Sequence, residues 1–278
     1  MPGRKDANLP MKNLNIVNKE ASNAYQEDYM KFHLMERPDF FEFYLKGGVD
    51  LDEYLPKLLG SVKGLKLLDT CCACDAKQAF SWHNLGAKVT ACDISDKAIA
   101  IASQNAANMN FDISFVVADM QSLEPIADNS HDIVFATYPV WVQDINEACK
   151  AWSRVLKDGG KLLWHMSHPV TDCLSANKDS LNVVTNYNAP HTEMYSRFDG
   201  TPMANRQAGG WSVELPVAEH FWRISDILNA VAGAGFKIAQ THEAYDVRNS
   251  HKFTHRDAKS GQEQMCNLPG EFTVLAVK

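Results

Sequence analysis

The sequence predicts an α/β fold, in which a mostly parallel sheet carries helices on both faces. Residues 65–165 alternate short apolar segments, several ending in an acid, with amphipathic segments of helical length. The chain has 278 residues, 45% of them hydrophobic, which is enough to bury a large core. Because no internal repeat is visible, one α/β unit is the simplest interpretation.

Five strands are predicted in this region, and a strand pair near the C-terminus completes the sheet. The first strand, "LKLLDT", is an apolar run that ends in an acid, a pattern typical of a buried parallel strand. The predicted strands are residues 65–70, 87–93, 112–119, 131–139 and 161–167, followed by 237–243 and 272–277.

Helices are predicted between the strands. The clearest has Ile99, Ala102, Ala106 and Met109 on one apolar stripe. Another begins with an aspartate that a glutamate follows three residues later, as in a capping box, and it ends at "KDGG". The predicted helices are residues 76–86, 95–110, 144–156 and 224–236.

The remaining segments define the expected domain organisation. Residues 1–17 are predicted to be a flexible N-terminus, and residues 18–278 a single domain. Residues 18–58 form a helical cap rich in aromatic residues, ahead of the first strand. Residues 168–222 lose the strand and helix patterns and are rich in Asn, Pro, His, Gly and aromatic residues. A segment of this length is usually a lid, so we predict a substrate lid here.

Composition narrows the class of partner. The formal net charge of −7 argues against nucleic acid, which is bound by clustered Lys and Arg. No apolar run approaches the roughly 20 residues of a membrane span, and the first residues lack the apolar core of a secretory signal. The seven cysteines do not have the density of a disulfide scaffold. We therefore expect a cytoplasmic protein whose partner is a small molecule, and no oligomeric state is indicated.

Five motifs, in order, resemble those of the class I S-adenosylmethionine-dependent methyltransferases: "LLDT" with its loop, "VTACDIS", "VVADMQSL", "HDIVFAT" and "VLKDGGKLLW". The resemblance covers residues 60–165 well and 220–278 moderately. It implies a Rossmann-like class I methyltransferase fold with a mostly parallel seven-stranded sheet, and S-adenosyl-L-methionine as cofactor. A dinucleotide-dependent dehydrogenase is disfavoured because its G-x-G-x-x-G loop is absent.

The resemblance also implies that the cofactor lies across the carboxyl ends of the strands. Asp93 would accept both ribose hydroxyls, with a helix cap as the alternative. Asp119 and Met120 would lie at the adenine, with a solvated strand-end acid as the alternative for Asp119. The predicted cofactor contacts are Asp69, Cys71, Ala73, Asp75, Asp93, Ile94, Asp119, Met120 and Thr137.

The first loop departs from the family pattern D-x-G-x-G-x-G. After Asp69, the three glycine positions are taken by Cys71, Ala73 and Asp75. A positive φ at Cys or Ala would cost roughly 1 kcal/mol or more. The carboxylate of Asp75 would repel that of the cofactor unless it faces the ammonium or the sulfonium. The loop also looks about one residue longer than is typical of the family, so its register could shift by one.

The cysteines of this loop raise the question of a metal or thiol site. Structural zinc is bound by two separated pairs of ligands, and Cys71, Cys72 and Cys74 are spaced too closely for that. A nucleophilic thiol would need a basic neighbour. We therefore predict no metal site, with the cysteines filling small positions in the loop and the core.

Methyl transfer from a sulfonium requires positioning, and a base when the acceptor carries a proton. We predict catalytic roles for Tyr138, His165 and Tyr29. The alternatives are a structural role for each histidine and simple packing for the aromatic residues. An aromatic lid would also suit the enclosure of a small or aromatic substrate. The predicted substrate contacts are Tyr25, His33, Trp141, His168 and Tyr195.

Three functions remain open at this point. The first is methylation of a small molecule, in specialised metabolism. The second uses the sulfonium as a leaving group, so that the methionine amine closes onto its own γ-carbon and methylthioadenosine is released. The third is a non-catalytic scaffold on the same fold, which the intact Asp69, Asp93 and Asp119 argue against.

Overall fold

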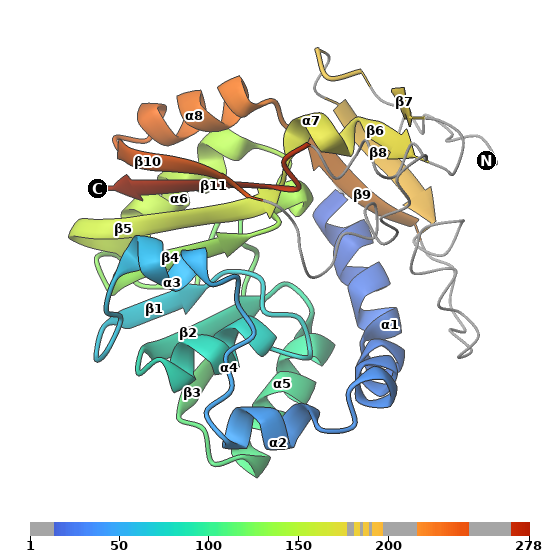
Figure 1. Cartoon of the computed structure of the whole chain (residues 1–278), viewed down its shortest axis with the longest axis vertical. Helices are drawn as coiled ribbons and strands as arrows, with labels where there is room; N and C mark the ends of the chain where they lie inside the picture. Colours follow the sequence, from blue (N-terminus) through green and yellow to red (C-terminus); the bar gives the residue numbers. More distant parts are fainter. Residues whose placement is uncertain (1–13, 177–180, 184–185, 189–190, 197–215, 245–267) are drawn as a thin grey trace.

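The computed structural model describes residues 14–176, 181–183, 186–188, 191–196, 216–244 and 268–278 (Figure 1). Its main feature is a seven-stranded sheet in the order β10-β11-β5-β4-β1-β2-β3. β11 runs antiparallel to both β5 and β10, and the other pairings are parallel. The mostly parallel seven-stranded sheet is therefore confirmed. The strands are β1 (Lys66–Asp69), β2 (Lys88–Asp93), β3 (Ile113–Val117), β4 (His131–Thr137), β5 (Leu156–Ser167), β10 (Lys237–Ala244) and β11 (Glu271–Val277).

Alternating side chains of the central strands supply two cores, one on each face of the sheet. Leu67 and Ile133 belong to the first core, whereas their neighbours Leu68 and Val134 belong to the second. This follows from the strand geometry, in which successive side chains point to opposite faces. α4 (Lys77–Asn84) and α5 (Asp96–Asn108) contribute to the first core, and α6 (Ile145–Val155) and α8 (Ile224–Gly233) to the second.

The largest difference at a predicted strand boundary lies at the start of β5. The strand begins at Leu156, five positions ahead of the predicted Lys161, and takes in the "KDGG" turn. The pairing partner in β5 shifts from Leu156, opposite His131, to Lys161, opposite Ile133. Gly159 has φ +76°, the left-handed conformation that glycine adopts readily. The turn is therefore an irregularity within the strand, and α6 ends at Val155 as its pattern predicts.

The N-terminal cap contains α1 (Leu14–Glu36), α2 (Phe40–Leu45) and α3 (Tyr54–Leu59). The predicted flexible segment 1–17 is wrong for residues 14–17, which are already helical, while residues 1–13 lie outside the described part of the chain. Phe40, Tyr44 and Leu55 are buried in the first core, so α2 and α3 pack on the same face as α4 and α5.

The predicted lid contains regular structure that its sequence pattern did not indicate. After α7 (Pro169–Asp172), β6 (Leu174–Ala176) pairs with β7 (Leu181–Val183). β8 (His191–Ser196) pairs antiparallel with β9 (Pro216–Phe221), and β9 lies beside α1 in Figure 1. The described part of residues 168–222 therefore contains two strand pairs outside the main sheet.

One buried side chain joins α1 to this lid. Asn18 accepts a hydrogen bond from the Ala218 N–H (2.7 Å) and donates one to the Ala218 carbonyl (2.9 Å). Both residues are buried, so these backbone groups would lose their partners if the amide were removed.

We expect Asn18→Ala to lower the free energy of unfolding by about 2–3 kcal/mol, because it leaves two buried backbone groups unsatisfied. Urea unfolding would measure the change. Asn146→Ala is the matched control, since Asn146 is exposed on α6 and should cost less than about 0.5 kcal/mol. Equal losses for the two variants would contradict the anchoring role of Asn18.

Candidate active site

The site lies where the parallel strands end, and the first loop closes over the ends of β1 and β2. Asp69, the last residue of β1, accepts a hydrogen bond from the Cys71 N–H at 3.3 Å. Asp93, the last residue of β2, accepts from the Ala73 N–H at 3.0 Å and from the Ser95 N–H at 2.9 Å. The two strand-end carboxylates therefore hold the loop backbone between them.

The backbone of this loop shows which residues replace the family's glycines. Ala73 has φ +51° and Ala76 has φ +45°, whereas Cys71 and Asp75 are not in the positive-φ region. Ala73 thus takes a glycine-type conformation at the predicted position. The second residue of this loop with positive φ is Ala76 and not Asp75. The observed conformation is compatible with the one-residue shift of register that the sequence left open.

Asp75 points toward α1 instead of lining the loop as a glycine would. Its carboxyl is buried, and Oδ2 lies 3.4 Å from Nε2 of His33, an ion-pair distance without hydrogen-bond geometry. A second residue of α1, Gln26, also contacts this loop: its Oε1 atom accepts a hydrogen bond from the Cys74 N–H at 3.1 Å. The predicted substrate residue His33 is therefore placed against the cofactor loop.

The loop cysteines are packing residues. Cys72 and Cys74 are fully buried in the first core, and the Cys74 thiol donates to the Gln26 carbonyl at 3.2 Å. Burial raises the pKa of both thiols above the ordinary value, which keeps them protonated. Neither is poised as a nucleophile, since that role requires a thiolate.

The carboxyl of Asp69 is the most perturbed acid of the loop. Burial raises its pKa to about 7, the Cys71 N–H opposes this, and the charges of Asp93 and Asp75 add to it. Its Oδ2 atom has no hydrogen-bond partner among the described residues. A buried carboxyl with an unsatisfied oxygen is suited to meet a cationic or hydrogen-bond-donating group of a ligand.

The remaining predicted cofactor residues lie at the ends of β2, β3 and β4. Ser95 caps α5 by accepting from the Ala98 N–H, so the helix-cap alternative does not apply to Asp93. Asp119 accepts from the side chain of Asn15 at 2.5 Å, and burial raises its pKa. Ile94 is half-buried, while Met120 and Thr137 are buried.

A second group of side chains gathers where β4, β5 and β11 meet. Tyr138 has φ +46° and lies next to His165, whose carbonyl accepts from the Tyr138 N–H at 2.8 Å. The two rings are 5.7 Å apart. Both residues line a cavity of about 60 Å³, together with Thr137, Asp52 and Glu271. A cavity of this size holds several water molecules.

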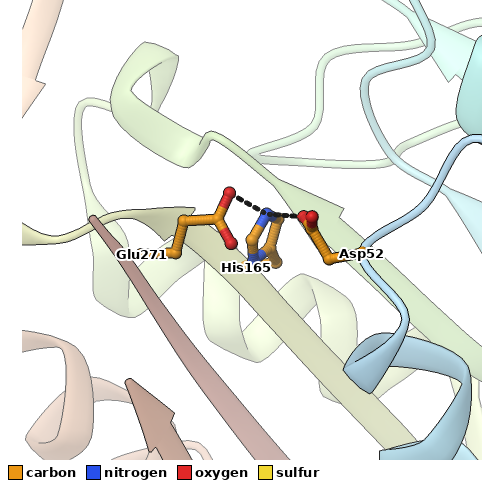
Figure 2. A group of neighbouring side chains, drawn as sticks. All are labelled: Asp52, His165 and Glu271. Atoms are coloured by element: carbon orange, nitrogen blue, oxygen red, sulfur yellow. Dashed lines mark ion pairs between the residues drawn. The ribbon is translucent and has the colours of Figure 1, made fainter. Parts of the chain in front are cut away.

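His165 is buried in this group between two carboxylates (Figure 2). Its Nε2 atom lies 3.8 Å from Oε1 of Glu271 and 3.9 Å from Oδ2 of Asp52. Its Nδ1 atom is 3.0 Å from the Thr273 hydroxyl. Burial lowers the pKa of His165 to about 4, so the imidazole is neutral at pH 7.

Sequence reasoning missed Asp52, Tyr54, Glu271 and Thr273. Tyr54 donates to Oε2 of Glu271 at 2.8 Å across a separation of 217 residues. Asp52 lies before α3, Tyr54 is the first residue of α3, and Glu271 and Thr273 belong to the last strand; these segments share no motif. A polar residue inside the otherwise apolar "EFTVLAV" strand is the one sequence signal that could have indicated them.

The other predicted site residues lie on different elements of the chain. Tyr29 packs against Tyr25 and His33 on α1, with ring centroids 6.2 and 4.5 Å away. Trp141 is partly buried against the second core. Tyr195 lies in β8, and its side chain is outside the described part of the structure.

The structure shows intramolecular contacts for both ring nitrogens of His168, a residue that we predicted to contact substrate. Its Nδ1 accepts from the Val170 N–H and caps α7, and its Nε2 lies 3.0 Å from Oε1 of Glu243. With both nitrogens engaged and the residue buried, His168 has a structural role.

Comparison with known proteins shows what part of the chain is similar to. Residues 68–164 match the family model described as a methyltransferase domain. The chain is 26% identical over 122 residues to phosphoethanolamine N-methyltransferase 3 of Arabidopsis thaliana, covering 44% of this chain and 25% of that enzyme. It is 23% identical over 155 residues to an uncharacterised protein of Haemophilus influenzae, covering 51% of this chain and 61% of the relative. The chain thus spans less than two thirds of either curated relative.

Solved structures show the same fold. An S-adenosylmethionine-dependent methyltransferase from Mesorhizobium loti has a TM-score of 0.61 at 20% identity, covering 81% of this chain and 96% of the other. The [4+2]-cyclase SpnF has a TM-score of 0.55 at 16% identity, covering 98% and 99%. At these identities the likeness establishes the fold and leaves the reaction open.

The sheet order and the solved structures therefore define a fold of the class I methyltransferase type. More particularly, residues 68–164, about a third of the chain, match a methyltransferase domain, and S-adenosylmethionine-dependent methyltransferases are among the structures that share the fold. Within the described residues, no helix combines the length and the apolar character needed to cross a membrane.

We expect Asp69→Asn to stabilise the ligand-free protein at pH 8 by roughly 2–4 kcal/mol. The folded pKa of about 7 lies above the ordinary 3.8, so this carboxyl favours folding below 3.8 and costs stability as the pH rises to 7. The gain should therefore fall to about half or less at pH 5.

Urea unfolding at both pH values measures this gain. Asp158→Asn is the control, because that side chain is fully exposed. A gain in stability that does not depend on pH, or a loss of stability at pH 8, would contradict the raised pKa of Asp69.

Proposed function

We propose that this protein is an S-adenosylmethionine-dependent methyltransferase that acts on a small molecule. The observation that carries the proposal is a set of three acids around a loop of glycine-type conformation: Asp69 and Asp93 are the last residues of β1 and β2, and Asp119 follows the end of β3 by two residues. These residues stand in a segment that matches the methyltransferase domain. Specialised metabolism and a cytoplasmic location are parts of the same proposal.

The residues present suit this cofactor. The unsatisfied oxygen of Asp69 fits an ammonium group, and the small Ala73 at positive φ permits close approach of a ligand to the backbone. We assign the ribose hydroxyls to Asp93, with Ile94 beside it, and the adenine to Asp119 and Met120. We assign Cys71, Ala73 and Thr137 to the end of the cofactor that carries the reacting methyl group. The bound cofactor supplies an activated methyl group on a sulfonium.

In this proposal, Asp75 no longer contacts the cofactor. Its carboxyl is turned toward His33 on α1, so it does not oppose the carboxylate of the cofactor directly. Its role is to tie the loop to α1, together with Gln26 and Cys74. His33 then positions the loop and does not touch substrate.

We assign the acceptor to the cavity beside Tyr138 and His165, at the ends of β4 and β5. In-line transfer depends mainly on holding the acceptor in position, and these two residues flank the space next to Thr137. Tyr25, Tyr29 and Trp141 remain proposed contacts from α1 and from the 3-10 helix η2 (Pro139–Trp141).

A second candidate is cyclisation, with S-adenosylmethionine as the substrate. The amine nitrogen would form a bond to the γ-carbon, the carbon–sulfur bond would break, and the amine proton would pass to a carboxylate. Asp69 favours this reaction, because its pKa of about 7 suits proton exchange with an amine. The products would be azetidine-2-carboxylate and methylthioadenosine. The structural likeness to SpnF, a cyclase, is a precedent for such a change of reaction on this fold.

One experiment separates these functions. The purified protein is incubated with S-adenosylmethionine alone and then with a library of small acceptors, and the products are identified by mass spectrometry. S-adenosylhomocysteine that forms only with an acceptor supports methylation. Methylthioadenosine without any acceptor supports cyclisation and overturns the first proposal. Absence of cofactor binding would leave only the scaffold.

We expect Asp93→Ala to weaken S-adenosylmethionine binding by at least about tenfold, because the ribose hydroxyls lose a charged acceptor. Isothermal titration calorimetry measures the affinity. Asp158→Ala removes an equal charge from a fully exposed position and should leave the affinity unchanged. Unchanged affinity in Asp93→Ala would remove the ribose assignment.

A further inference from the structure

We propose that Asp52, His165 and Glu271 form a binding site for a divalent transition-metal cation. The three side chains come from separate parts of the chain, the segment before α3, β5 and the first residue of β11. They converge from three directions on a common point (Figure 2). The sequence predicted no metal site, and its cysteines are not part of this one.

The distances have the scale of a metal site. One ligand atom from each residue can be chosen so that all three lie within 4.8 Å of one another. Nitrogen and oxygen ligands bind a cation such as zinc at about 2.0–2.2 Å, so two ligands of one cation stand no more than about 4.4 Å apart. The observed 3.8 and 3.9 Å from Nε2 to the two carboxylates fall inside that limit, while the two carboxylates lie within 4.8 Å of each other, so that binding could draw them slightly together. The two distances from Nε2 are also too long for direct hydrogen bonds.

Charge favours a cation at this point. Two carboxylates that face one imidazole nitrogen repel each other unless positive charge lies between them. A cation bound between the two carboxylates and the ring would supply that charge. A neutral imidazole with its proton on Nδ1 offers the Nε2 lone pair to a metal.

The surroundings of His165 match those of a metal-bound histidine. The second ring nitrogen of such a histidine normally donates to an oxygen that fixes the orientation of the ring. Here Nδ1 is 3.0 Å from the Thr273 hydroxyl and 3.3 Å from the Tyr54 hydroxyl. Tyr54 also donates to Oε2 of Glu271 at 2.8 Å, so one phenol supports two of the three ligands.

The cavity leaves room for further ligands of the cation. All three residues line the space of about 60 Å³, which would hold a cation with its water molecules. Three protein ligands with open positions are typical of catalytic metal sites, and structural sites are usually closed by four. A set of one nitrogen and two oxygens suits manganese, iron or zinc, whereas calcium and magnesium prefer oxygen alone.

The proposed metal site also indicates which chemical group the acceptor carries, and this step rests on the proposed function. The open positions face the cavity that we assign to the acceptor, next to Thr137 and Tyr138. An acceptor hydroxyl or carboxylate that takes one of these positions would be oriented by the cation. A metal-bound hydroxyl also loses its proton more easily, which would supply the activation that a separate base gives elsewhere. His165 is then a metal ligand and not a general base.

The test measures Mn²⁺ binding to chelator-treated, full-length protein without S-adenosylmethionine, by the loss of the free Mn²⁺ signal in electron paramagnetic resonance. We expect one strongly bound ion per chain. Asp52→Asn and Glu271→Gln should each weaken binding by at least about tenfold, because each removes a charged ligand. Asp50→Asn is the matched control, since Asp50 lines the same cavity but pairs with Arg37 at 3.1 Å, and it should change affinity by less than about threefold.

A second measurement tests the nitrogen ligand. Pulsed electron paramagnetic resonance of the Mn²⁺ complex should show nitrogen coupling that His165→Gln abolishes. Absence of a bound ion, equal affinity in wild type and both carboxylate variants, or no nitrogen coupling would each overturn the site. If Glu271→Gln does not fold, the half-buried Asp52 still carries the test. Because no cofactor is added, failure here leaves methyl transfer untouched, and failure of methyl transfer leaves this result standing.

Discussion

Parallel pairing of β1 with β2 and β4, and of β2 with β3, is the constraint on which the rest of the structure depends. It brings the carboxyl end of each strand to one edge of the sheet, where side chains distant in sequence meet. Asp69 and Asp93 are the last residues of their strands, and together they fix the backbone of the first loop. The acids at this edge therefore organise the loop that would meet a ligand.

The first loop keeps a glycine-type path without glycine because its neighbours enforce it. Ala73 is held at positive φ while its N–H is bound to Asp93, and Cys74 is fixed by Gln26 of α1 through both its N–H and its thiol. These contacts offset the conformational cost of about 1 kcal/mol that an alanine pays there. α1 is in turn tied to β9 through Asn18, so the loop, the cap and the lid form one connected unit.

The two ends of the site differ in electrostatic character. At the ends of β1 and β2, the acids Asp69 and Asp93 accept hydrogen bonds from the backbone of the chain itself. At the ends of β4 and β5, two carboxylates face a neutral, buried imidazole across a small cavity. The first arrangement suits a ligand rich in hydroxyl and ammonium groups. The second suits a cation, which is why the proposed cofactor and the proposed metal occupy separate parts of one edge.

The sequence by itself determined the seven strands of the main sheet and the helices between them, since apolar periodicity is a local property of each segment. It also placed Asp69 and Asp93 at strand ends, whereas Asp119 lies two residues beyond the end of β3. Only the tertiary structure decided that Ala76, and not Asp75, adopts a positive φ, that His168 caps a helix, and that β8 pairs with β9. The meeting of Asp52 with Glu271 is likewise invisible in the sequence. It arises from long-range packing of the cap against the last strand, which no local pattern encodes.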